Sequence, residues 1–146
     1  MKFFKTLGAA LALLLLAGAG AQAAERMAVK VNIANVRSGP GAGYQLLWQV
    51  EKYHPLLIEE KRGGWYRFKD FEGDQGWIAD TLLDHTPTVI VRVDRCNVRT
   101  GPGTDYSIAF TVDRGIPFKV LQKKGGWLEI EHADGDKGWI FSKLVW

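Results

Sequence analysis

The chain has 146 residues, of which 47% are hydrophobic and 24% charged, a composition that excludes an intrinsically disordered protein. Its formal charge of +3 falls to +1 without Lys2 and Lys5, because 17 basic residues then face 16 acidic ones. A nearly neutral chain argues against nucleic-acid binding, which depends on neutralising phosphates. The single cysteine excludes an internal disulfide framework and a multi-cysteine zinc site.

The first 23 residues, Met1–Ala23, have the pattern of a secretory signal peptide. A basic start is followed by an uncharged apolar stretch, and Ala21-Gln22-Ala23 offers small residues to a signal peptidase. The apolar stretch is about 15 residues long, shorter than the roughly 20 that a spanning helix needs, so an uncleaved anchor is the weaker alternative. We expect a soluble mature protein that begins near Ala24, has no stable membrane span and is periplasmic or secreted.

The rest of the chain contains the same unit twice, at a fixed offset of 62 residues. Asn35–Gly41 returns as Asn97–Gly103, Gly63-Gly64-Trp65 returns as Gly125-Gly126-Trp127, and the Gly-Asp-x-Gly-Trp-Ile motif occurs at 73–78 and 135–140. Between residues 27–84 and 89–146, 21 of 58 positions are identical. Three motifs that share one register predict two copies of one domain, at 27–84 and 89–146, joined by a short linker at 85–88.

Within each unit, short apolar runs alternate with Gly and Pro, which predicts short strands separated by tight turns. Val29, Val31 and Ile33 alternate with polar residues and predict a half-buried strand. The later strands expected in the first unit are Leu46–Val50, Pro55–Glu60, Trp65–Phe71 and Gln75–Ile78. No segment resembles a helix longer than one turn, so the pattern predicts an all-β protein built from two small barrels.

The motifs Asn-Val-Arg-[Ser/Thr]-Gly-Pro-Gly, Gly-Gly-Trp and Gly-Asp-x-Gly-Trp-Ile, in this order and twice, resemble the bacterial SH3-like domain family. The resemblance covers nearly all of residues 29–83 and 91–145, and it implies a five- to six-stranded SH3-like barrel in each unit. Such modules commonly occur in exported proteins, where they bind peptidoglycan or its stem peptides or act as protein-interaction modules beside a hydrolase domain. No hydrolase domain is evident here, nor is the signature of proline-binding SH3 domains.

Strand parity predicts which aromatic residues are free to bind a ligand. Tyr66 and Phe68 are expected to face inward, as are their counterparts Leu128 and Ile130. Trp65 and Trp127 then lie on the polar face, where each either caps its barrel or forms a stacking platform for a peptide or sugar. Ile78 and Ile140 are expected inward, which turns Trp77 and Trp139 outward, with structural packing favoured over binding. Trp48 matches Phe110 and is expected in the core.

Four further residues complete the candidate binding set. Tyr44 and Tyr106 follow the Gly-Pro-Gly turns and are expected to pack beside the outward Trp residues and line a groove. Arg37 and Arg99 occupy equivalent outward positions. Each is interpreted as a loop-bracing side chain, with a carboxylate clamp for a stem peptide as the alternative.

No catalytic or metal-binding set is evident in the sequence. His54, His85 and His132 lack metal-ligand spacing, and Glu59 and Glu60 are adjacent on a strand and so are expected to face opposite ways. Cys96 is expected to be a small buried thiol, although an unpaired cysteine in an exported protein also permits an intermolecular disulfide. We therefore expect no enzyme activity, cofactor or metal.

The interpretation is a non-catalytic exported module that binds peptidoglycan stem peptide in the bacterial envelope. Two linked sites would gain avidity from a raised effective concentration. The alternative is a protein-interaction or scaffold module of a periplasmic complex. In both cases the partner lies in the cell envelope and no nucleic acid is involved.

Overall fold

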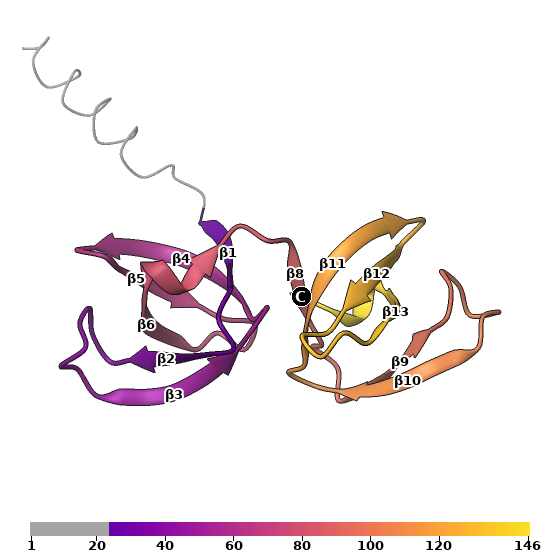
Figure 1. Ribbon diagram of the computed structural model, residues 1–146, viewed down its shortest axis with the longest axis horizontal. Helices are drawn as coiled ribbons and strands as arrows, with labels where there is room; N and C mark the ends of the chain where they lie inside the picture. The colour runs from indigo at the N-terminus through magenta and orange to yellow at the C-terminus, as the bar shows by residue number, and fades with distance from the viewer. Residues whose placement is uncertain (1–23) are drawn as a thin grey trace, which may run out of the picture.

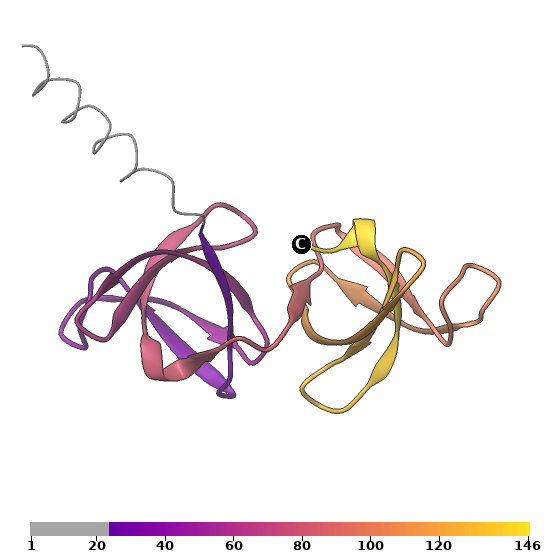
Figure 2. The same cartoon turned by 90° about the horizontal axis from the view of Figure 1, so that it is seen from above.

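The computed structural model describes residues 24–146 and contains two barrels side by side (Figures 1 and 2). We call residues 25–84 the first barrel and residues 88–146 the second barrel. The predicted signal peptide, Met1–Ala23, lies outside the described residues. Within the described part of the chain, no helix is long and apolar enough to cross a membrane. The all-β fold with two repeated units, predicted from the repeated motifs, is confirmed.

The first barrel is one antiparallel sheet in the strand order β3-β2-β6-β5-β4-β1-β7. A single turn of 3₁₀ helix, η1 (Asp80–Leu82), precedes its last strand. The strands are β1 (Glu25–Val29), β2 (Ile33–Arg37), β3 (Leu46–Glu51), β4 (Pro55–Arg62), β5 (Trp65–Lys69), β6 (Gln75–Ala79) and β7 (Leu83–Asp84).

The second barrel repeats this arrangement in a six-stranded antiparallel sheet ordered β10-β9-β13-β12-β11-β8. The 3₁₀ turn η2 (Ser142–Leu144) follows its last strand, as η1 follows β6 in the first barrel. The strands are β8 (Thr88–Ile90), β9 (Arg95–Arg99), β10 (Ile108–Asp113), β11 (Pro117–Lys124), β12 (Trp127–Glu131) and β13 (Lys137–Phe141).

Each barrel wraps around its own core of alternating inward side chains. Phe68 and Ile78 are fully buried in the first barrel, and Ile130 and Ile140 are fully buried at the matching positions of the second. Trp48 packs against the first core and contacts Phe68 edge-on, with ring centroids 6.3 Å apart. The inward face predicted by strand parity is therefore confirmed. The complete fully or nearly buried set of the first core is Met27, Val29, Ala34, Val36, Val50, Leu56, Ile58, Phe68, Ile78 and Leu83.

The predicted strand through Val29, Val31 and Ile33 is wrong. β1 ends at Val29, the chain bends at 31–32, and β2 starts at Ile33, whose side chain is 64% exposed. Alternation in this segment spans two strands that lie in different parts of the sheet, because the Lys30 amide bonds to Leu82 and the Ile33 backbone pairs with Glu51. Periodicity alone does not reveal such a bend.

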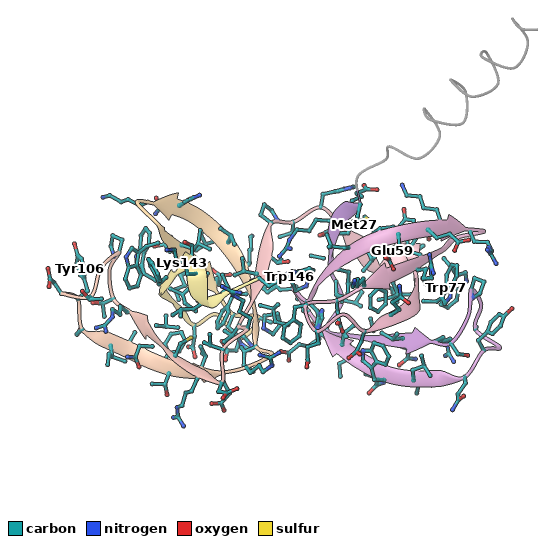
Figure 3. The ribbon with its side chains drawn as sticks, turned by 180° about the vertical axis from the view of Figure 1, so that it is seen from behind. Met27, Glu59, Trp77, Tyr106, Lys143 and Trp146 are labelled. Carbon is teal, nitrogen blue, oxygen red and sulfur yellow. The ribbon has the colours of Figure 1, made fainter. Side chains whose placement is uncertain are left out.

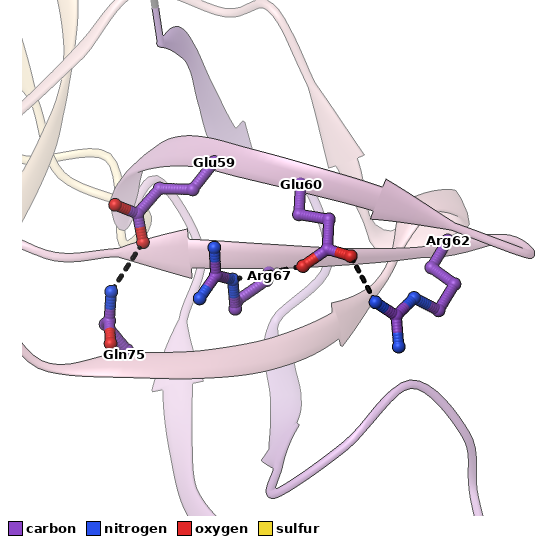
Figure 4. Close-up of polar contacts among 5 residues, drawn as sticks. All are labelled: Glu59, Glu60, Arg62, Arg67 and Gln75. Carbon is purple, nitrogen blue, oxygen red and sulfur yellow. Dashed lines mark hydrogen bonds and ion pairs between the residues drawn. The ribbon is translucent and has the colours of Figure 1, made fainter.

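Glu59 and Glu60 face the same side of the sheet, which contradicts the parity prediction. The register between β4 and β5 shifts between Ile58 and Glu60, so Glu59 is the extra residue of a β-bulge. Figure 4 shows both carboxylates on one face: Glu59 accepts a hydrogen bond from Gln75 at 2.8 Å, and Glu60 forms ion pairs with Arg62 at 2.5 Å and Arg67 at 3.4 Å.

Glycine allows two neighbouring strands of each sheet to pack closely. A Cβ placed on Gly76 would lie 2.3 Å from Val36 Cγ1, and one on Gly138 would lie 2.5 Å from Val98 Cγ1. Strands β6 and β13 therefore lie beside β2 and β9 at a separation that leaves no room for a side-chain carbon at these glycines. The valines beneath are fully buried, so they have no free space into which to move.

Two arginines connect the barrels. Arg26 Nη2 on β1 donates to the carbonyl oxygens of Thr88 at 3.0 Å and Trp146 at 2.9 Å, and its guanidinium carbon lies 4.4 Å from the centroid of a Trp146 ring. Arg114 reaches back from the second barrel to Glu72, at 3.8 Å. Figure 3 shows Trp146 at the place where the barrels meet. The junction is thus held by directional contacts in addition to the short connector.

We expect Gly76→Ala to lower the free energy of unfolding by about 1–3 kcal/mol, the usual cost of forcing extra volume into a filled core. Gly43→Ala is the matched control, because a Cβ on Gly43 meets nothing within 4 Å. Denaturant unfolding followed by circular dichroism measures both. If the two variants were equally stable, the contact between Gly76 and Val36 would not be the constraint on how closely β6 and β2 pack.

His54 makes the stability of the first barrel depend on pH. Burial lowers the pKa of His54 below its ordinary value of 6.5, while the Pro55 carbonyl, 3.2 Å from Nδ1, and the charge of Asp70 oppose this shift. Below about pH 6.5 the unfolded chain therefore binds more protons than the folded chain, and folding stability falls as the pH falls. We expect the melting temperature to drop between pH 7 and pH 5, and to drop less in His54→Gln; equal slopes would refute the assignment.

Candidate functional site

Each Gly-Pro-Gly turn forms a loop that is covered by its own tyrosine. In the first barrel a Cβ on Gly39 would lie 2.3 Å from Tyr44 Cδ1, so the ring lies directly over the glycine. Arg37 Nη1 donates to the Tyr44 carbonyl oxygen at 3.1 Å. The Ser38 amide donates to the Gln45 carbonyl at 2.9 Å and closes the base of the loop. Arg37 makes the loop-bracing contact that was the first interpretation of this residue.

The second barrel holds its loop with one more hydrogen bond. Arg99 Nη1 donates to the carbonyl oxygens of Thr104 at 3.2 Å and Tyr106 at 3.0 Å. The Tyr106 ring covers Gly101, since a Cβ there would lie 2.2 Å from Tyr106 Cδ1. Tyr106 remains 49% exposed, at the end of the second barrel away from the first (Figure 3).

A groove of about 580 Å³ lies between this loop, the strands β9, β12 and β13, and the turn η2. We call it the second-barrel groove. Two of the predicted site residues, Arg99 and Trp127, line it. Its complete lining is Cys96, Asn97, Arg99, Gly103, Thr104, Asp105, Trp127, Phe141 and Leu144.

An aromatic pair forms one wall of the second-barrel groove. Trp127 on β12 and Phe141 on β13 are register partners, and their rings lie 5.5 Å apart between centroids at an interplanar angle of 56°. Both side chains are half-buried, so one side of the pair is available to a ligand. Stacking on an aromatic wall suits the apolar faces of peptides and sugars.

Polar groups complete the groove. Arg99 uses Nη1 for the loop carbonyls, and a guanidinium has five N–H donors, so donors remain for a carboxylate. Asn97 adds an amide, and Asp105 adds a carboxylate from the loop. The combination of an aromatic wall, a guanidinium and a carboxylate can contact the apolar, anionic and cationic parts of a peptide.

Cys96 lines the groove as a half-buried thiol rather than a fully buried one. Burial raises the pKa of Cys96 above its usual value, which keeps the thiol protonated at neutral pH. A protonated thiol is a poor nucleophile, so Cys96 contributes an apolar surface to the groove. An intermolecular disulfide through this residue stays a prediction.

Trp77 and Trp139 point away from the cores but are not exposed platforms. Each is only 9% exposed. Trp77 pairs in register with Arg37 and Arg67, and the Arg62 guanidinium carbon lies 5.5 Å from the centroid of the Trp77 ring. The ion pairs drawn in Figure 4 join Arg62 and Arg67 to Glu60 on this face of the sheet. Tyr44 and Tyr106 each cover a loop glycine. That they also pack beside these Trp residues stays a prediction.

The first barrel lacks several side chains that shape the second-barrel groove. Trp65 is half-buried like Trp127, but its register partner is Ala79 where the second barrel has Phe141. Cys96 and Asp105 correspond to Ala34 and Gly43. The first barrel therefore retains Arg37, Tyr44 and Trp65 without the aromatic partner that completes the wall.

Sequence reasoning missed Phe141, Leu144 and Asn97 as groove residues. The available signal was the difference between the repeats: Phe141 is aromatic where the first unit has alanine, on the same outward parity as Trp139. Leu144 is placed by the η2 turn, which no local pattern predicted. Among residues 24–146, no group of three or more His, Cys, Asp or Glu side chains is arranged to hold a metal ion.

Comparison with known proteins defines the family. The model of the bacterial SH3 domain family matches the chain twice, over residues 30–85 and 92–146. These matches cover most of the described residues, and the chain belongs to this family.

The curated relatives are longer proteins that match over part of their length. A protein named as a putative N-acetylmuramoyl-L-alanine amidase, YrvJ of Bacillus subtilis, is 29% identical over 122 residues, which are 76% of this chain and 23% of that protein. A probable cell wall amidase, LytH of Staphylococcus epidermidis, is 33% identical over 60 residues, 40% of this chain and 21% of that protein. The chain thus spans less than a quarter of the length of either relative.

Solved structures include an NlpC/P60 family protein from Bacillus cereus with a TM-score of 0.41 and 13% sequence identity. That alignment covers 84% of this chain and 56% of the other.

We expect Arg99→Ala to loosen the Gly-Pro-Gly loop of the second barrel without unfolding it. A hydrogen bond from a charged donor contributes about 1.5 kcal/mol, so amide exchange at Thr100 and Tyr106 should accelerate about tenfold. Hydrogen exchange followed by NMR measures this, with Arg95→Ala as the control, because Arg95 lies on the same strand and bonds only to Thr111 Oγ1. Unchanged exchange in Arg99→Ala would contradict the bracing contact.

Proposed function

We propose that the chain is an exported, non-catalytic binding module that recognises peptidoglycan through the second-barrel groove. The observation that carries the proposal is the groove itself, where Trp127, Phe141 and Arg99 meet on one surface. A stem peptide offers an apolar backbone face for the aromatic pair and carboxylates for the guanidinium.

The family and the relatives support the same ligand class. The chain matches proteins named as cell wall amidases over a minor part of their length, and it consists of two bacterial SH3 domains in the described residues. A domain of this kind beside an amidase would bring that enzyme to its polymer. In this chain the second barrel would be the principal binding unit, because the first barrel has Ala79 in place of Phe141. The envelope is accordingly the proposed location.

A protein-interaction function is the second candidate, favoured by apolar side chains at the open sheet edges. Leu46 and Leu47 on β3 are 47% and 42% exposed, and Ile108 on β10 is 52% exposed. β3 and β10 are the terminal strands of their sheets, so their free backbone groups can pair with a strand from a partner.

We expect the chain from Ala24 onward to co-sediment with purified peptidoglycan at low salt, and Phe141→Ala to weaken this binding about fivefold. That factor corresponds to about 1 kcal/mol, a typical value for one aromatic pair. Leu121→Ala is the matched control, because Leu121 is an exposed apolar residue on β11 outside the groove.

Circular dichroism must show both variants folded. Equal binding of Phe141→Ala and Leu121→Ala would remove the groove from the proposal. No retention of the wild-type chain, together with a specific protein captured by crosslinking at β3 or β10, would favour the interaction function instead.

A further inference from the structure

The two barrels form a second, smaller pocket where they meet, on the first-barrel side of β11. Its volume is about 220 Å³, enough for one small charged group and its neighbouring atoms but too small for a disaccharide. Both barrels contribute to it, so neither barrel forms it alone. Its lining is Val29, Lys30, Lys52, Tyr53, Asp84, Thr86 and Lys119. We call it the junction pocket.

Positive charge is concentrated in the junction pocket. Lys30, Lys52 and Lys119 line it, and among residues 24–146 none of the three has a carboxylate within 4 Å. Asp84 is the one acidic residue in the lining, and its Oδ1 accepts a hydrogen bond from the Thr86 amide at 3.0 Å. Three ammonium groups around one small pocket repel one another, and an anion placed among them would reverse the sign of this interaction.

The register of the second barrel explains why Lys119 belongs to the pocket. Phe118 is fully buried in the second core, so its neighbour Lys119 lies on the outer face of β11. Thr88 and Glu131 are its strand partners, and Thr88 also receives Arg26 from the first barrel. The outer face of β11 is therefore the face that meets the first barrel. The corresponding residue of the first barrel is Leu57, so this charge exists only in the second copy.

Backbone conformation provides an independent observation at the same pocket. Tyr53 has φ of +73°, and among residues 24–146 it is the only non-glycine residue with positive φ. Its counterpart Gly115 has φ of +87°, and both amides make the same bond, to Val29 at 2.8 Å and to Val91 at 2.9 Å. The second barrel thus has the residue that this conformation favours, whereas the first barrel keeps a tyrosine at a conformational cost.

The side chain of Tyr53 contributes to the junction pocket. Tyr53 lines the junction pocket, and Lys52 Nζ lies 5.2 Å from the centroid of its ring. This contact holds one of the three ammonium groups against the pocket wall. The phenol also adds a hydroxyl donor, which Gly115 cannot supply.

From the lysines, the register and the strained tyrosine, we propose that the junction pocket binds an anionic oxygen group, a carboxylate or a phosphate. This site goes beyond the wall-binding proposal, because the second-barrel groove lies on other strands and shares no residue with it. A ligand bound here would contact both barrels at once.

The test is a titration followed by two-dimensional NMR, with inorganic phosphate in one arm and N-acetyl-D-alanine in the other, at constant ionic strength maintained with NaCl. We expect saturable shifts of the Tyr53, Thr86 and Lys119 amides in at least one arm. The stronger arm identifies the group as a phosphate or a carboxylate. Equal shifts on adding NaCl alone, or no saturable shift in either arm, would overturn the proposal.

Two variants taken from the repeat itself sharpen the test. Lys119→Leu gives the second barrel the residue of the first, and Tyr53→Gly gives the first barrel the residue of the second. Lys119→Leu should weaken anion binding about fivefold, the upper range for one exposed ion pair. Tyr53→Gly should also weaken it, because the phenol and its contact with Lys52 are lost. The spectrum of each variant should stay that of a folded protein. Lys123→Leu removes the same charge from an exposed position of β11 outside the pocket and should bind like the wild type. Equal affinities of Lys119→Leu and Lys123→Leu would also overturn the site.

Discussion

The pairing of β6 with β2, and of β13 with β9, places a glycine directly against a valine in each barrel. Gly76 lies against Val36, and Gly138 lies against Val98, at separations that leave no room for a side-chain carbon. This approach brings β6 beside β2 and β13 beside β9, although β2 and β6 are separated by three other strands along the chain. The Gly-Pro-Gly loops and their arginines start from β2 and β9. In the second barrel this places the loop beside β13, where Gly103, Thr104 and Asp105 line the groove.

The repeat allows positions that are the same in both units to be compared, within a single chain, with positions that differ. Residues that are the same in both units make the same structural contacts in each. Arg37 and Arg99 donate hydrogen bonds to their loops, and Tyr44 and Tyr106 cover loop glycines. Residues that differ change a surface while the fold is kept. Phe141 replaces alanine at the groove. Differences of this kind lie at the far end of the second barrel and at the junction.

The sequence predicted the fold well because its strongest signals are local. The Gly-Gly-Trp and Gly-Trp-Ile motifs specify turns and inward residues, and Ile78 and Ile140 are buried as expected. The predictions failed where the conformation of a segment depends on its pairing with a strand that is distant in the sequence. The bend after Val29 is fixed by bonds to other strands, and the bulge that turns Glu59 and Glu60 to one face is a property of the β4–β5 ladder. Parity cannot detect an inserted residue.

The same reason explains why Arg99 and Trp127 were predicted as groove residues and Phe141 was not. Arg99 and Trp127 were candidates because each stands in a repeated motif on an outward position. Phe141 becomes a partner of Trp127 only through the β12–β13 register. Burial of Trp77 depends on Arg62, which reaches it across the sheet. A motif predicts that a side chain points away from the core, but its exposure to solvent depends on the residues of the neighbouring strands.

Duplication also creates a surface that a single domain does not have. Arg26 in the first barrel occupies the position of Thr88 in the second, and the two are in direct contact across the junction. The equivalent positions of the repeat have therefore taken complementary functions, one as donor and one as acceptor. Lys119 is a second example, because the first copy has a leucine at this position and the second copy has a charged residue that faces the first copy. In a second barrel on its own, the charge of Lys119 would not lie beside the strained turn at Tyr53. The junction is thus a surface at which equivalent positions of the two copies carry different residues that contact each other.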